Sequence, residues 1–216
     1  MSNKNLLAIL IAGALLVGNT SMASDVYIDQ AGSTSTIDIT QTGNGNRVGS
    51  SGDASTIVGD NTDIDITQTG GSNEADIKMS TGTSGSIINY DATGGTNLFN
   101  LEIDGAADTT VTTTITGDSN EVTVCGTLGT AASTGVSATC ATGVQADTTA
   151  STITITGDSN KVALGLDAPN ATNNVTIGAN VTSSFNVVNI SQTGLDSPNV
   201  TLNVDGDTNA INITQD

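Results

Sequence analysis

The chain contains no histidine and no tryptophan, and aromatic residues make up only 2% of its 216 residues. Histidine is the side chain that most often transfers protons near neutral pH, and it is a common zinc ligand. Without histidine, the chain lacks the residue on which acid–base catalytic sites and zinc sites most often depend. The sequence also lacks a G-x-S-x-G nucleophile motif and a P-loop. Together these absences argue against an enzyme, and we predict no catalytic residue, no cofactor and no metal ligand.

Positively charged residues are scarce as well. Four Lys and Arg stand against 22 Asp and Glu, which gives a formal net charge of −18. Such a chain repels polyanions, so nucleic acid is not an expected partner. With so few aromatic residues, a broad two-layer core would lack the large side chains that usually fill it. Ile, Val and Leu are nevertheless frequent and regularly spaced, which favours a narrow aliphatic core over disorder.

Long apolar runs are missing except near the N-terminus, where Leu6–Val17 is apolar. This run follows Lys4 and precedes the small-x-small sequence Ser21–Ala23, a pattern typical of a secretory signal peptide cleaved after Ala23. It is too short for a membrane-spanning helix, so we expect no transmembrane segment. We therefore predict a signal peptide over residues 1–23. A single secreted domain over residues 24–216 would reach the cell exterior through the periplasm.

What the chain does have is a short repeating pattern, seen first in Ser24–Gln41. It indicates two strands, Ser24–Gln30 and Ser35–Gln41, whose alternate side chains lie on one face. On that face a small polar residue comes first, two apolar residues follow, and a glutamine comes last. A buried amide is stabilised if it stacks on its own copy in the next layer, because each amide then donates to and accepts from its neighbour.

Degenerate copies of this unit follow, each with a glycine two residues after the strand face and an Asn or Ser three residues later. The copies recur roughly every 25 residues, which is typical of stacked-repeat proteins, so we predict an all-β β-solenoid of about seven strand–turn–strand rungs. The predicted polar ladder is Ser24, Gln30, Ser35, Gln41, Asn46, Gln68, Asn73, Asn97, Asn120, Asn160, Asn186, Gln192, Asn209 and Gln215. The predicted turn glycines are Gly32, Gly43, Gly70, Gly94, Gly117, Gly157 and Gly206.

Two cysteines, Cys125 and Cys140, flank most of a low-complexity insertion over residues 126–148 that is rich in Gly, Ala, Ser and Thr. In an exported chain, a pair this close most simply forms one disulfide across a surface loop. Metal-binding cysteines are the less favoured alternative, because no histidine is present to complete a common zinc set. We expect the insertion to leave one side of the solenoid and to contribute little to the stacking of the rungs.

The repeat resembles the curlin repeat, in which Ser, Gln, Gly, Asn and a second Gln recur at fixed spacing. The matching residues are Ser24, Gln30, Gly32, Gln41, Gln68, Gly70, Asn73, Gly206, Asn209 and Gln215, with Ser35 in place of Asn. The central copies carry Ala92, Ile103, Ile115, Ile155 and Leu166 at the glutamine positions. The resemblance implies subunits that stack end to end as cross-β amyloid in an extracellular fibre for biofilm or adhesion. It also implies self-association, related fibre subunits and outer-membrane secretion machinery as partners.

Two alternatives remain open from the sequence. A secreted β-solenoid could be a non-polymerising binding module, either an adhesin or an ice-binding protein, because outward T-x-T pairs occur at Thr112–Thr114 and Thr152–Thr154. The turns that contain Asp118, Asp158 and Asp207 could ligate calcium through their carboxylates. The repeated inward amides favour a structural protein, namely a major, minor or nucleating fibre subunit.

Overall fold

The computed structural model describes residues 24–50, 54–79, 85–103, 109–117, 119–125, 128–130, 139–140, 148–156, 159–165, 172–177, 186–192, 199–204 and 208–215. The predicted signal peptide and most of the predicted insertion lie outside these residues. Two of the predicted turn glycines, Gly157 and Gly206, lie outside them too. The same holds for Asp118, Asp158 and Asp207, on which the calcium alternative depends.

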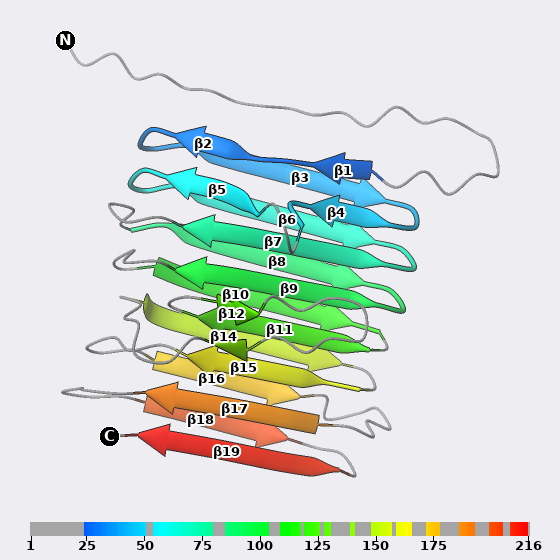
Figure 1. The fold of residues 1–216 in the computed structure, drawn as a ribbon, viewed down its shortest axis with the longest axis vertical. Helices are drawn as coiled ribbons and strands as arrows, with labels where there is room; N and C mark the ends of the chain where they lie inside the picture. The colour runs from blue at the N-terminus through cyan, green and yellow to red at the C-terminus, as the bar shows by residue number, and fades with distance from the viewer. Residues whose placement is uncertain are drawn as a thin grey trace.

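Two long parallel sheets, stacked rung upon rung, make up the fold (Figure 1). Sheet A contains β1 (Ser24–Val26), β2 (Asp29–Ala31), β4 (Asn46–Val48), β5 (Ser55–Val58), β7 (Asn73–Met79), β9 (Asn97–Ile103), β11 (Asn120–Cys125), β15 (Lys161–Gly165), β17 (Asn186–Gln192) and β19 (Asn209–Gln215). Sheet B contains β3 (Thr36–Thr42), β6 (Asp63–Thr69), β8 (Ile87–Thr93), β10 (Thr109–Thr116), β14 (Thr148–Thr156), β16 (Thr172–Ile177) and β18 (Asn199–Val204). The prediction of an all-β β-solenoid is confirmed.

The predicted count of about seven rungs is corrected, because the strands form a β-solenoid of about four turns. In the described part of the chain, β3 with β4 and β5, β6 with β7, β8 with β9, and β10 with β11 follow one another regularly. The insertion then separates β11 from β14 and interrupts the repeat. Strands β14 to β19 still pair in parallel with the two sheets on the far side of this interruption.

The interior of the solenoid follows from the alternation of side chains along each strand. In β3, for example, Ile37, Ile39 and Gln41 are buried, whereas the residues between them are exposed. The buried aliphatic side chains of the two sheets meet in one continuous core, with Tyr90 and Phe99 as its only aromatic members among the described residues. Their rings stack with centroids 4.5 Å apart. A narrow core of this kind needs few aromatic residues, as the composition indicates.

The predicted strand Ser24–Gln30 is divided into β1 and β2 in the structure. The two parts pair with β4 and β5, which are themselves separated in sequence. Hydrogen bonds from Gly49 N to Val26 O and from Thr56 N to Ile28 O, both 2.8 Å, hold the two sides of this gap together. The first rung is therefore interrupted at the same place as the rung next to it.

Part of the insertion forms a short antiparallel pair, β12 (Leu128–Thr130) with β13 (Thr139–Cys140). Strand β13 lies close to β11 and β15 of sheet A. Cys125, at the end of β11, is disulfide-bonded, and Cys140 is the one other cysteine of the sequence. Among the described residues, no helix is long and apolar enough to cross a membrane.

Candidate functional site

A column of asparagine side chains runs through the solenoid at the start of the sheet A strands. The buried members, each no more than 2% exposed, are Asn46, Asn73, Asn97, Asn120, Asn160 and Asn186. Amide Nδ2–Oδ1 hydrogen bonds join Asn46 to Asn73 (3.0 Å), Asn73 to Asn97 (2.9 Å), Asn160 to Asn120 (2.7 Å), Asn186 to Asn160 (2.8 Å) and Asn209 to Asn186 (2.7 Å). These bonds connect the amides of neighbouring rungs in two runs, one from Asn46 to Asn97 and one from Asn120 to Asn209.

The same amides hold the turns in place. Asn97 Nδ2 donates to the carbonyl oxygen of Gly94 at 2.9 Å, and Asn120 Nδ2 donates to that of Gly117 at 2.6 Å. Asn46 makes the equivalent bond to Gly43 at 3.1 Å. This contact explains why glycine and asparagine recur three residues apart: the glycine makes the turn, and the asparagine side chain binds its carbonyl group.

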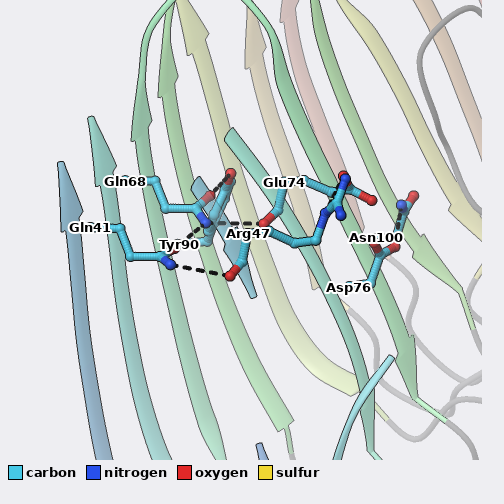
Figure 2. Close-up of polar contacts among 7 residues, drawn as sticks. All are labelled: Gln41, Arg47, Gln68, Glu74, Asp76, Tyr90 and Asn100. Carbon is cyan, nitrogen blue, oxygen red and sulfur yellow. Dashed lines mark hydrogen bonds and ion pairs between the residues drawn. The ribbon is translucent and has the colours of Figure 1, made fainter. Parts of the chain in front are cut away.

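A shorter glutamine ladder lies in sheet B (Figure 2). Gln68 is fully buried, and its Nε2 donates to Gln41 Oε1 at 2.7 Å and to the carbonyl oxygen of Glu74 at 3.0 Å. The hydroxyl group of Tyr90 donates to Gln68 Oε1 at 2.8 Å. Burial raises the pKa of Tyr90, so it stays a neutral donor. Ala92 occupies the register position beside Gln68, and Tyr90 supplies the polar group that a third glutamine would have provided.

Other predicted ladder residues have different neighbours. Gln30 is buried, but it pairs in register with Ile57, and its Nε2 donates to Ser35 Oγ at 2.6 Å. Ser24 pairs in register with Asn46. Gln192 and Gln215 are also partners in register, but their side chains lie outside the described part of the structure. The structure thus brings the asparagines into a long ladder, whereas the described glutamines form only one stacked pair.

The outer face of sheet A carries ion pairs that the sequence analysis missed. Arg47 Nε lies 3.0 Å from Glu74 Oε2, Lys161 Nζ lies 3.5 Å from Glu121 Oε2, and Lys78 pairs with Glu102. All three glutamates of the chain and all its basic residues after Lys4 are used. The nearby Glu74 raises the pKa of Arg47. The sequence did contain an indication of these ion pairs, because four of the six charged residues directly follow a ladder asparagine.

Asp76 lies on the same face and is buried, with only 2% of its surface exposed (Figure 2). Asn100 Nδ2 donates to Asp76 Oδ1 at 2.5 Å, while Asp76 Oδ2 has no hydrogen-bond partner within the described residues. Burial and, to a smaller extent, the neighbouring Glu74 carboxylate raise the pKa of Asp76 to about 7, although the hydrogen bond from Asn100 opposes the shift.

The two ends of the described stack present unpaired strand edges. At one end β3 pairs only with β6, and at the other β18 pairs only with β16 and β19 only with β17. On β19, Ile211 and Ile213 are 45% and 43% exposed. An apolar face and free backbone groups at the last described rung are suited to pairing with another strand.

We find no match to this chain among family models, curated proteins or solved structures. Within the described residues, no three His, Cys, Asp or Glu side chains are grouped so that they could hold a metal ion. The most extensive arrangement of polar side chains in the described structure is the asparagine ladder, whose hydrogen bonds run from Asn46 to Asn97 and again from Asn120 to Asn209.

The substitution Gln68→Ala is expected to lower the free energy of unfolding by about 2–3 kcal/mol, because Gln41 Oε1 and the Tyr90 hydroxyl group each lose a buried partner. Urea unfolding followed by circular dichroism would measure this loss. Thr67→Ala is the matched control, since Thr67 is the exposed neighbour on the same strand and its replacement should change stability by less than about 0.5 kcal/mol. Equal losses in the two variants would contradict the assignment of Gln68 to the ladder.

Proposed function

We propose that this chain is a secreted structural protein, a curlin-like subunit of an extracellular amyloid fibre in biofilm matrix or adhesion. The subunit would be a major, minor or nucleating component. Its partners would be further copies of itself, related fibre subunits and the outer-membrane machinery that secretes them. The signal-peptide pattern at residues 1–23 and the resemblance of the repeat to curlin repeats support this proposal.

The observation that carries the proposal is the self-complementary interface between rungs. The ladder asparagine of one rung binds that of the next, and apolar side chains stack on apolar side chains in register, as in the pairing of Ile64 with Ile88. A surface that binds a copy of itself within one chain can bind the same surface of another chain. In-register stacking of identical side chains is also the arrangement that stabilises cross-β fibres.

Assembly would proceed by pairing of strand edges at the ends of the stack. The exposed edge of β18 and β19 would continue onto the edge formed by β1, β2 and β3 of a second copy. The exposed Ile211 and Ile213 would then be covered by the apolar Val26 and Ile28, which are only partly buried. Each chain would add its own stack of rungs, spaced about 4.8 Å apart along the fibre.

The purified chain is expected to form fibres that bind thioflavin T and diffract with a cross-β spacing of about 4.7–4.8 Å. Dye fluorescence over time and fibre diffraction would measure this. Seeding with preformed fibres should shorten the delay before growth, which separates a subunit that assembles alone from one that needs a nucleator. A chain that stays monomeric for days at high concentration, with and without seeds, would favour the rival function, a non-polymerising adhesin or ice-binding module.

A further inference from the structure

The outer face of sheet B carries two adjoining columns of threonine side chains. One column is Thr42, Thr69, Thr93, Thr116 and Thr156, and each member is the register partner of the next. The second column lies two residues earlier on the same strands and contains Thr40, Thr67, Asp91, Thr114 and Thr154. Four of the five successive strands therefore present the sequence T-x-T outward. We call these ten residues the threonine grid.

The backbone beneath the grid is highly regular. The carbonyl groups of Thr69, Thr93, Thr116 and Thr156 each accept a hydrogen bond from the glycine of the neighbouring turn, and all four N–O distances are 2.9 Å. The residue between the two columns is buried in every strand, so a side chain that packs in the core anchors each strand beneath the grid. The grid residues on β3, β6, β8 and their neighbour β10 are all exposed, and the two on β14 are half-buried.

These contacts set the spacing of the hydroxyl groups. Neighbouring strands lie about 4.8 Å apart, and residues i and i+2 of one strand lie about 6.6 Å apart. Because threonine is branched at its β-carbon, few side-chain rotamers are open to it, and a column of equivalent threonines can point its hydroxyl and methyl groups in repeated directions. The face thus offers a two-dimensional lattice in which hydrogen-bonding and apolar groups alternate.

We propose that the threonine grid binds ice, with the ordered water lattice of an ice crystal face as its ligand. The water oxygen atoms on a face of an ice crystal also repeat at fixed spacings in two directions. Hydroxyl groups at those spacings can take the place of water in the lattice, while the methyl groups displace poorly ordered water between them. No basic residue lies on this outer face among the described strands, so no Lys or Arg side chain covers the grid.

This site is independent of assembly. The grid lies on the side of the solenoid, whereas the proposed fibre contacts lie at its ends (Figure 1). A fibre would therefore keep the grid accessible and extend the same face along its length. Asp91 is the one member that breaks the pattern, because it places a charge and no hydroxyl group among four threonines.

The test uses the purified full-length chain before it assembles. Thermal hysteresis and the uptake of fluorescently labelled protein into a slowly growing ice crystal would be measured for the parent and for three variants. The double variant Thr67→Tyr/Thr114→Tyr should lose both activities, because two bulky side chains lift the ice surface off the grid. Thr36→Tyr adds the same side chain to an exposed position of sheet B outside the grid and should keep both activities. Circular dichroism of each variant checks that the fold is retained.

The third variant, Asp91→Thr, completes the grid and is expected to increase thermal hysteresis above that of the parent. This gain cannot be explained by loss of folding. No hysteresis and no uptake into ice for both the parent and Asp91→Thr would overturn the proposal. It would also be overturned if the double tyrosine variant kept the activity of the parent. Fibre formation is measured separately by dye binding, so failure of either proposal leaves the other testable.

Discussion

Replacing Gly94 with alanine is expected to destabilise the protein by about 4 kcal/mol or more, because steric overlap and backbone strain add together. A β-carbon at Gly94 would lie 1.4 Å from the carbonyl oxygen of Gly70 and 3.0 Å from Asn73 Nδ2. Gly94 also has a φ angle of +153°, which residues with a side chain rarely adopt. The obstructing oxygen belongs to the backbone of the neighbouring turn, so relief requires the two rungs to move apart.

Two other glycines separate the contributions to this effect. At Gly95 a β-carbon would meet the carbonyl oxygen of Gly71 at 3.7 Å, which is an ordinary contact, so Gly95→Ala should change stability by less than about 1 kcal/mol. At Gly43 nothing lies within 4 Å, but φ is +138°, so Gly43→Ala should lose only the strain energy of about 1–3 kcal/mol. Urea unfolding of unassembled protein would rank the three variants. Equal losses at Gly94 and Gly95 would contradict close contact between the turns.

The substitution Asp76→Asn is expected to raise the free energy of unfolding at pH 8 by about 4 kcal/mol, since each unit of pKa shift corresponds to about 1.4 kcal/mol. Burial raises the pKa of Asp76 from 3.8 to about 7, so the native state holds this proton more firmly than the unfolded state does. The resulting stabilisation is fully present below pH 3.8 and is lost as the pH rises through about 7. Asparagine has nearly the same shape, can still accept from Asn100, and never ionises.

Urea unfolding between pH 4 and pH 8 would test this expectation. The parent should lose stability across this range, and Asp76→Asn should lose much less. Asp38→Asn is the matched control, because Asp38 is an exposed carboxylate on the opposite outer face and its replacement should leave the slope of the parent unchanged. If the stability of the parent does not fall between pH 5 and pH 8, Asp76 does not ionise in a buried site.

The two outer faces of the solenoid have different chemistry. On sheet A, charges pair between rungs, and Asp76, Leu98, Asn100 and Thr123 are buried. On sheet B the outward residues with described side chains are exposed or half-buried threonines, aspartates, Asn89 and Ile87, and Asn89 donates a hydrogen bond to Asp65 of the neighbouring rung at 2.7 Å. This difference leaves sheet B as the side on which an external ligand can bind.

Most of the local structure could be predicted from the sequence alone. The alternation of polar and apolar residues indicated the sheet B strands with their inward faces, and glycine followed three residues later by asparagine indicated the turns. These features depend on backbone geometry over a few residues, so they are visible in a short stretch of sequence. The division of the first strand into β1 and β2 was not visible, because it depends on an interruption in the neighbouring rung.

Other features were decided only when rungs were placed in contact. The Gln41–Gln68 ladder ends at Tyr90 because Ala92 leaves room for that ring, and this depends on the register between β6 and β8. The ion pair of Arg47 with Glu74 and the burial of Asp76 likewise join residues from different rungs. So does the alignment of five threonines in one column. The sequence by itself determined which residues turn inward, whereas the stacking register decided which of them meet, because contacts between rungs join residues more than 20 positions apart.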